Sequence, residues 1–484
     1  MSIGVEVTTS LRSGPTNPGV PSGVLHIAAV TAKGPTSRAV LVTSLAQYQA
    51  VFGGLTPSTA DGFFTAAGFF EEGGAKLAVS RLVGPAATKG VLTLKDTAGV
   101  DTVKVEAVDP GPASTDLHVT TFTTDAGFTV RVVSAETEGV LAEFTGLSSP
   151  ADLVAAAAGN PVVKLTSLGS TTTAPGNNPA VITDVALSAG TDDRGSITTQ
   201  TVLDALDRNG GINPGGAVAA PGWSATQVGA GLLAHSRKHN TVALLAGSVT
   251  DTPTTLANTA DTLSKTGDGE YGALFHPWLT IPDGTRTRNV SPEGAIAGVR
   301  ARVHQNGFWR IPAGDPGVFR WVKSTVIPVD TALNNTLAKS LVNGIATRGT
   351  RVGPYNWSSL STDRDNLGFL AARDVLNNLN VAITAALEPF VWSVIDYRQH
   401  LVGQVEAAVV GVLDPIAKAD GFFPLPSGDG TSTDPGYSVS VDTSIGSPTV
   451  VGANELVVRA AVRLAPYAQL ISVEIIKVAL TASV

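Results

Sequence analysis

A long polar segment interrupts a series of predicted strands and capped helices. This interruption is the sequence feature that most constrains the fold. In the first stretch, the apolar run at 24–30 predicts a strand buried on both faces. Ser44 and Thr59 then predict the N-caps of two helices, which two Gly-Gly pairs end. A second strand is predicted at 76–82. This βααβ order is typical of an α/β layer.

The middle of the chain has a different character. Between about 84 and 190 it is rich in Thr, Ser, Gly and Asp, with short alternating runs that predict β-strands. Strand and helix then alternate again, with strands at 217–220 and 241–247 and a helix around 231–238 between them. We therefore expect one α/β domain that a β-rich insertion splits.

The C-terminal third predicts helices followed by strands. Leucine and isoleucine spacing predicts a helix at 370–387, and a second helix is expected from about 391 to 412. A loop rich in Gly, Ser and Asp precedes a predicted strand at 455–464. This order is typical of an α+β domain.

Both ends of the chain are apolar alternating strands beside helix and strand breakers. The predicted strands carry Ile3, Val5 and Val7 at one end and Ile471, Val473 and Ile475 at the other. A leash rich in Pro and Gly follows the first strand, and its predicted hinge residues are Pro15, Pro18, Gly19 and Pro21. At roughly 3.3 Å per residue, twenty extended residues reach on the order of 60 Å, far enough to contact a neighbouring subunit.

Composition excludes several classes of function. The 484 residues are 43% hydrophobic and include no cysteine, which excludes disulfides and thiolate metal sites. A formal net charge of −8 argues against nucleic acid as the main partner. No run reaches the ~18 apolar residues that span a bilayer, and the N-terminus lacks the pattern of a secretion signal. We expect synthesis and assembly in a cytoplasm.

Two short motifs resemble enzyme signatures. Residues 228–234 match GxGxxA, a dinucleotide fingerprint, but no strand directly precedes them. The Gly222–Thr226 segment follows a predicted strand as a nucleophile elbow does, but a threonine stands where a small glycine is needed. Helix packing through small residues and capping by Ser224 are the favoured interpretations. An α/β hydrolase or a dinucleotide-binding enzyme stays a distant alternative.

The polar clusters in this sequence are expected to have structural and not catalytic roles. His235 and His239 stand one helical turn apart and could share a metal, but the cations between them favour a solvated basic patch. Turn and helix-end roles are expected for the acidic pairs Glu71-Glu72 and Asp192-Asp193. No catalytic residue, cofactor or metal is therefore predicted.

Several segments together resemble the tail sheath proteins of contractile-tailed bacteriophages and related contractile injection systems. These segments occur along the chain in the same order as in that family. They are 26–54, 69–82 with its Phe-Phe-x-x-Gly-Gly helix end, 187–193, 270–283, the pattern of Pro292, Gly294, Ala297 and Gly298, and 342–361. The resemblance covers most of the chain outside 84–187.

The resemblance implies that this chain is divided into five parts. It places a split α/β core domain beside a β-rich, outward-facing insertion and a C-terminal α+β domain that faces a tube. The expected boundaries are 1–22 for an N-terminal arm, 23–84 plus 188–345 for the core, 85–187 for the insertion, 346–464 for the C-terminal domain and 465–484 for a C-terminal arm.

The resemblance also implies a function without catalysis. Such a protein polymerises into a helical sleeve around an inner tail tube and contracts to drive the tube through a cell envelope. Its partners are then further copies of itself, the tube protein, and baseplate and terminator proteins, in a virion tail assembled in the host cytoplasm. Arg364 and Arg373 are candidates for tube contact, although a solvated helix face is favoured for them. A headless injection system or bacteriocin is the alternative.

Overall fold

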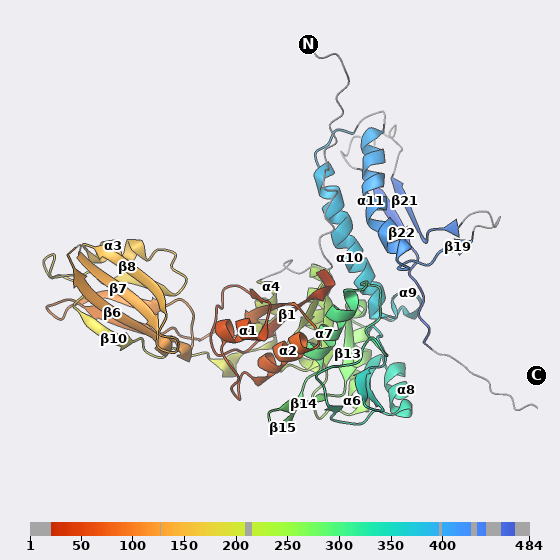
Figure 1. The fold of residues 1–484 in the computed structure, drawn as a ribbon, viewed down its shortest axis with the longest axis horizontal. Coiled ribbons are helices and arrows are strands. Elements are labelled where there is room, and N and C mark those ends of the chain that lie inside the picture. Colours follow the sequence, from red (N-terminus) through yellow and green to blue (C-terminus); the bar gives the residue numbers. More distant parts are fainter. Residues whose placement is uncertain are drawn as a thin grey trace, which may run out of the picture. The chain divides into compact units, whose positions relative to one another are not determined.

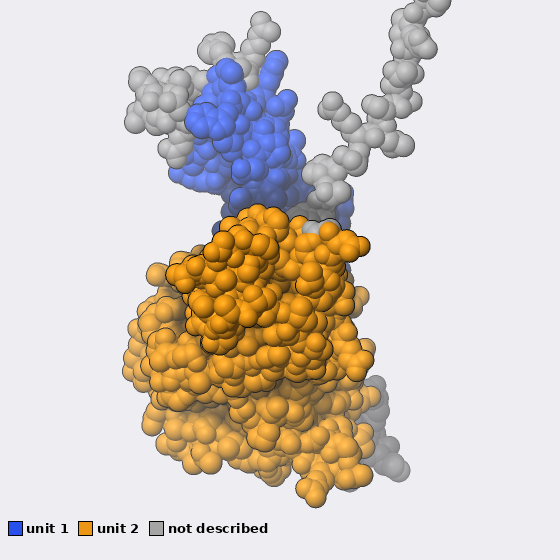
Figure 2. Space-filling view, turned by 90° about the vertical axis from the view of Figure 1, so that its left-hand side faces the viewer, with its two compact units in different colours: residues 1–18, 379–484 blue, residues 19–378 orange. Residues whose placement is uncertain are grey.

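The computed structural model describes residues 21–125, 127–208, 215–395, 399–426, 433–441 and 456–469. These residues form two compact units, which Figure 2 distinguishes by colour. One unit spans residues 19–378, and the described part of the other lies between 379 and 469. The boundary falls inside helix α10 (Leu370–Leu387). The α/β and α+β multidomain fold class expected from the sequence is confirmed.

A mixed sheet of eight strands organises the larger unit (Figure 1). Its order is β18-β17-β13-β12-β11-β1-β3-β2, with six parallel strands in the middle and an antiparallel strand at each edge. The strands are β1 (Val24–Ala29), β2 (Val40–Val42), β3 (Lys76–Arg81), β11 (Ala217–Ala219), β12 (Val242–Ala246), β13 (Gly272–His276), β17 (Val342–Arg348) and β18 (Arg351–Pro354).

Helices cover this sheet because its central strands are apolar on both faces. Four helices share one buried cluster with strands of the sheet: α4 (Thr199–Asp207), α5 (Ala225–His239), α6 (Pro253–Ser264) and α8 (Thr331–Lys339). Two more, α2 (Ala60–Glu71) and α7 (Glu293–His304), pack on each other and contact β1 and β12. The short helix α1 (Leu45–Phe52) begins after the predicted cap Ser44, whose side chain accepts from the amide of Gln47.

A β-rich segment with its own core interrupts the larger unit after β3. One sheet has the order β10-β6-β7-β8 and the other β4-β5-β9, and side chains of both join a single hydrophobic cluster. The elements are β4 (Val91–Lys95), β5 (Asp101–Ala107), β6 (Leu117–Thr124), β7 (Gly127–Ser134), β8 (Val140–Leu147), α3 (Pro150–Ala156), β9 (Val163–Ser167) and β10 (Ile182–Ala186). All of them lie within 85–187, the range expected for the insertion.

The chain leaves for this segment and returns from it side by side. The amide of Gly84 donates to the carbonyl of Asp192 at 2.8 Å, and Thr88 and Thr191 form an antiparallel bridge. Arg81, at the end of β3, donates to the Asp192 carboxylate at 2.6 Å, and Arg194 holds the other carboxylate oxygen. Asp192 was expected in a turn, but it is buried as the shared acceptor of two arginines.

A small three-stranded sheet completes the larger unit. It consists of β14 (Leu279–Asp283) between β15 (Arg286–Val290) and β16 (Ser324–Thr325). The predicted C-terminal domain boundary at 346 stays a prediction, while the compact units separate only after residue 378. The segment between 346 and 378 packs on the core of the larger unit. Its buried Trp357 ring lies 5.2 Å from the ring of Phe275 in β13.

The smaller unit combines helices with a two-stranded sheet. After α10 and a short 3-10 helix, η5 (Glu388–Phe390), helix α11 (His400–Lys418) packs on β21 (Tyr437–Val441), which pairs antiparallel with β22 (Val458–Val462). A second pair is β19 (Leu425–Pro426) with β20 (Thr433–Asp434). The helix predicted at 391–412 was therefore wrong in its bounds, since an irregular segment follows η5.

Candidate functional site

The β21–β22 sheet is the candidate interaction site of the smaller unit. It has only two strands, and among the described residues neither strand pairs with a third one along its outer edge. Two-stranded sheets are marginal on their own, and open edges invite a further strand. This sheet can therefore accept an added strand on either side.

Backbone geometry shows which groups face the open edges. The amide of Arg463 donates to the carbonyl of Gly436 at 2.7 Å, so residues 436 and 463 form a hydrogen-bonded pair. Bonded and non-bonded pairs alternate in an antiparallel ladder. The next pair, Tyr437 with Val462, and the pair Val439 with Ala460 thus direct their amides and carbonyls outward. These outward groups are the donors and acceptors that an added strand would use.

One face of this sheet is supported by α11. Leu401, Val402 and Val405 of the helix and Val441 of β21 form a small buried cluster. By length and composition α11 could cross a membrane, and three of its apolar side chains line this cluster. The sheet is thus held by a helix on one face, while no described strand pairs with its outer edges.

The loop after η5 exposes large apolar side chains. Trp392 is 98% exposed and Val394 is 83% exposed, with Val391 beside them. Trp392 also has a backbone φ of 69°, which is rare for a bulky residue. Exposed apolar patches of this kind mark interaction surfaces.

Most of the predicted arm and hinge residues lie outside the described residues. This holds for Ile3, Val5, Val7, Ile471, Val473 and Ile475, and for Pro15, Pro18 and Gly19. Pro21 is described and begins the 3-10 helix η1 (Pro21–Gly23). The hinge role of Pro21 stays a prediction.

The two predicted tube contacts differ in their surroundings. Arg364 is exposed at the first position of helix α9 (Arg364–Leu367). Arg373 instead donates to the Tyr271 hydroxyl at 2.7 Å, lies 4.5 Å from the centre of that ring and is 3.5 Å from Glu270. Among the described residues, the two arginines share no hydrogen-bond or ion-pair partner. Their role in tube binding stays a prediction, and Arg364 is the more accessible of the two.

Buried polar groups that the sequence analysis missed hold the larger unit together. Arg300 of α7 pairs with Asp374 of α10 at 2.5 Å, and both side chains are almost completely buried. Arg300 also donates to the carbonyls of Ser22 and Gly215. Burial raises the pKa of Asp374, and the Arg300 charge opposes this rise. The pair ties together segments from distant parts of the sequence.

Glu72 forms a second buried polar cluster. Its carboxylate accepts from the amides of Arg320 and Trp321 at 2.9 and 2.8 Å and from Arg302 at 3.1 Å. A helix-end role was expected for this residue. It does cap α2, but it is also fully buried and binds a loop some 250 residues away. No local pattern in the sequence could have identified these partners.

The two enzyme-like motifs have structural roles. Residues 228–234 lie inside α5 and do not open a helix after a strand, so the dinucleotide fingerprint is not formed there. A Cβ at Gly229 would come within 2.9 Å of Leu263, and one at Gly231 within 2.5 Å of Leu203. Ser224 is the N-cap residue of α5, and its amide donates to Gln227. Helix packing and capping, the favoured interpretations, are confirmed.

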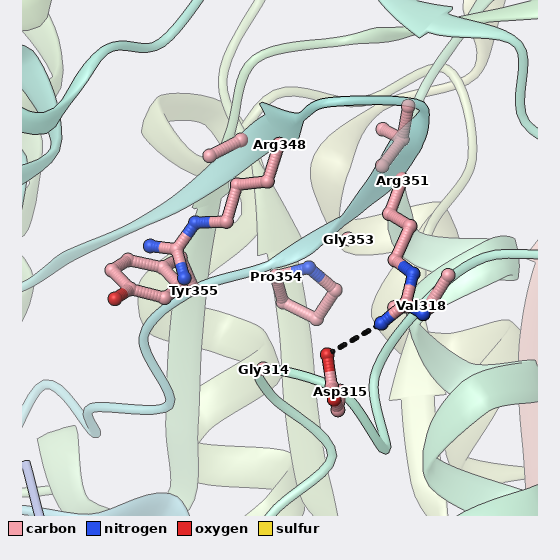
Figure 3. Close-up of a pocket in the computed structure, with 10 residues that line it drawn as sticks. Gly314, Asp315, Val318, Arg348, Arg351, Gly353, Pro354 and Tyr355 are labelled. Atoms are coloured by element: carbon pink, nitrogen blue, oxygen red, sulfur yellow. Dashed lines mark hydrogen bonds and ion pairs between the residues drawn. The ribbon is translucent and has the colours of Figure 1, made fainter.

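A small cavity next to the edge of the large sheet contains two arginines (Figure 3). Arg351 lies 3.0 Å from the Asp315 carboxylate, and the Arg348 guanidinium stacks on the Tyr355 ring. The cavity measures about 50 Å³. Small-molecule sites usually measure about 300–1,000 Å³, so this cavity has room for water but not for a nucleotide.

Comparison with solved structures identifies the fold. No family model matches this chain, and no curated protein matches it. The crystal structure of a sheath tail protein from Listeria innocua aligns with a TM-score of 0.65 at 13% identity, covering 92% of this chain and 92% of that chain. The contracted sheath of an extracellular contractile injection system, PVC, aligns with a TM-score of 0.54 at 15% identity, covering 99% and 97%.

The alignment with a third structure includes the full length of both chains. The cryo-EM structure of the anti-feeding prophage baseplate in the contracted state includes a chain with a TM-score of 0.58 and 15% identity, with 100% of each chain covered. The match thus includes the β-rich segment and the smaller unit as well as the large sheet. The described part of this chain has the fold of the tail sheath proteins.

Proposed function

We propose that this chain is a structural protein that polymerises into a contractile tail sheath. The observation that carries the proposal is the open β21–β22 sheet in a chain of sheath fold. Its outward backbone groups match the apolar alternating strands that the sequence predicts at both ends of the chain. Strand addition to a neighbour's sheet is a recognised mode of binding and needs no cofactor.

In this proposal the terminal arms link neighbouring subunits. The arm strands with Ile3, Val5 and Val7 and with Ile471, Val473 and Ile475 add to β21–β22 sheets of adjacent copies. The leash around Pro15, Pro18, Gly19 and Pro21 acts as the hinge. The exposed segment with Val391, Trp392 and Val394 supports an interface on the same unit, because an assembly would remove these side chains from water.

Contraction then follows from subunit packing. A long form held by a kinetic barrier shortens into a form that buries more surface between subunits, while the arms keep the copies connected. The partners are an inner tail tube, baseplate and terminator proteins, and the location is a virion tail or a related injection particle. The smaller unit is proposed to face the tube and the β-rich insertion to face outward. Catalysis has no part in this function.

Electron microscopy of the purified full chain tests the proposal. We expect hollow ribbed tubes from the full chain, formed alone or on an added tail tube. Deletion of residues 1–9 should leave soluble protein with an unchanged circular dichroism spectrum that forms no tubes. Tubes of normal appearance from the truncated chain would contradict the arm mechanism. Nucleotide binding or ester turnover by a chain that never assembles would instead favour the enzyme alternative.

A further inference from the structure

Three potential metal ligands meet where α4 and α5 end. Asp207 is the last residue of α4, and His235 and His239 lie one turn apart in the last part of α5. Asp207 Oδ1 lies 2.7 Å from His235 Nδ1 and 3.4 Å from His239 Nε2. One ligand atom from each residue lies within 4.8 Å of the others. This cluster is remote in sequence from the β21–β22 sheet and has no role in the proposed function.

The cluster is not the solvated basic patch that the sequence favoured. His235 is 7% exposed, and the two imidazole rings lie 4.5 Å apart. The Nε2 atom of His239 is shielded from solvent and has no hydrogen-bond partner among the described residues, although Asp207 Oδ1 is only 3.4 Å away. Buried polar atoms without a partner are rare in folded proteins. A cation bound between these atoms would satisfy this nitrogen.

The spacing of the donor atoms matches a metal site. Tetrahedral Zn²⁺ binds imidazole nitrogen and carboxylate oxygen at about 2.0–2.2 Å, which places neighbouring ligand atoms roughly 3.3–3.5 Å apart. The distance between Asp207 Oδ1 and His239 Nε2 already has this value, and the distance to His235 would lengthen by a little over half an ångström. Two histidines at i and i+4 on one helix are a known arrangement for binding zinc.

The identity of the donors also indicates the class of metal. Two imidazole nitrogens and one carboxylate favour Zn²⁺ and similar transition metals over Mg²⁺ and Ca²⁺, which prefer oxygen ligands. Lys238 Nζ lies 2.8 Å from Asp207 Oδ2. This contact holds the second carboxylate oxygen and leaves Oδ1 directed at the histidines, as an outer-shell partner does.

We propose that Asp207, His235 and His239 form a binding site for a divalent transition-metal ion such as Zn²⁺. Water completes its coordination. The ion joins the C-terminal ends of two helices that contribute to the main core, so its role is structural.

Titration of the full chain with metal alone tests this site. After treatment with a chelator and desalting, the chain should bind about one equivalent of Zn²⁺ by calorimetry, and Co²⁺ should give the visible absorption of a tetrahedral site. Zn²⁺ should also raise the midpoint of thermal unfolding. An excess of Mg²⁺ should leave Zn²⁺ binding unchanged. Absence of Zn²⁺ binding, or displacement of Zn²⁺ by Mg²⁺, would overturn the proposal.

Variants assign the binding to these residues. His239→Ala and the isosteric Asp207→Asn should each weaken Zn²⁺ binding by about a hundredfold or more, with circular dichroism showing that each variant is folded. The control His118→Ala changes a histidine that pairs with Asp184 at 2.8 Å in the β-rich insertion. It should bind Zn²⁺ as the unchanged chain does. Equal affinity in all three variants would assign the binding elsewhere and overturn the proposal.

Discussion

Arg300 and Asp374 illustrate what a buried ion pair costs when one partner is removed. Asp374→Ala leaves the Arg300 charge buried with only carbonyl acceptors, and we expect a loss of about 3–5 kcal/mol in the free energy of unfolding. The matched control is Asp315→Ala, which breaks the exposed pair with Arg351 and should cost about 0–1 kcal/mol. Urea unfolding followed by tryptophan fluorescence compares the two. Equal losses would contradict the assigned role of the buried pair.

Glu293 gives the stability of the chain a pH dependence. Its burial raises the pKa of the carboxyl to about 7 from the ordinary 4.5, although the Ser291 hydroxyl opposes the rise. Between these two values the folded chain holds a proton that the unfolded chain has released. The free energy of unfolding should therefore fall as pH rises through this window, by about 3 kcal/mol in total. Below pH ~4.5 the folded and unfolded chains are both protonated at this residue, and its contribution is constant.

The variant Glu293→Gln isolates this effect. Its urea midpoint, compared with that of the unchanged chain from pH 4.5 to 7.5, should lack the part of the slope that Glu293 contributes. Glu71→Gln changes an exposed glutamate as the control and should keep the slope. Identical slopes in all three proteins would show that the Glu293 carboxyl does not titrate in this window.

Polar contacts were the least predictable features at the residue scale. The acidic pairs at 71–72 and 192–193 were recognisable as pairs, but Asp192 binds Arg81 and Glu72 binds Arg302, each more than one hundred residues away. A local pattern of charge cannot show which carboxylate the fold will bury. The cap at Ser44 was predictable because its partner, the amide of Gln47, is local. Thr59 stands at the N-cap position of α2 as predicted, but its side chain makes no capping hydrogen bond.

At the scale of elements, glycines set the distance between α2 and α7. A Cβ at Gly298 would lie 2.5 Å from the Phe69 carbonyl, and one at Gly294 would lie 2.3 Å from that of Thr65. We expect Gly298→Ala to destabilise the fold by about 1–3 kcal/mol, because the helix backbones must separate. Gly403→Ala in α11 is the control, since nothing lies within 4 Å of its added Cβ. It should stabilise by roughly 0.5–1 kcal/mol. Thermal unfolding of both variants measures the contrast, and a stabilising Gly298→Ala would contradict it.

Strands and helices with strong local signals were predictable. The expected helix at 370–387 coincides with α10, and the expected strand at 76–82 contains β3. The error at 391–412 arose because apolar residues continue through the exposed loop after η5, whereas α11 begins only at His400. Strand β2 was missed because it has only three residues at an edge of the sheet. Tertiary packing, and not local propensity, decides such segments.

At the scale of the whole molecule, the order of motifs carried more information than any single motif. The resemblance predicted from the sequence agrees with a fold that aligns with sheath proteins at 13–15% identity over at least 92% of each chain. The α/β and α+β fold class was thus predictable from the sequence, whereas the strand order of the large sheet and the unpaired edges of β21–β22 among the described residues became visible only in the structure.

Those open edges allow a test of assembly that spares the fold of the subunit. Proline at positions 439 and 460 removes outward amides without removing a hydrogen bond between β21 and β22, and proline is tolerated on edge strands. We expect the double variant Val439→Pro with Ala460→Pro to stay soluble, with an unchanged circular dichroism spectrum, and to form no tubes in electron micrographs.

The matched control separates the backbone effect from loss of side chains. Val439→Ala with Ala460→Ser changes the same positions but keeps both amides, so it should assemble as the unchanged chain does. Tubes of normal length from the double-proline variant would show that these edges do not receive the arms. Failure of both variants to assemble would place the effect in the side chains. Assembly that depends on the two amides alone would show that subunits of this sheath fold are joined through their backbones, so the arm sequences can vary while their alternation stays constrained.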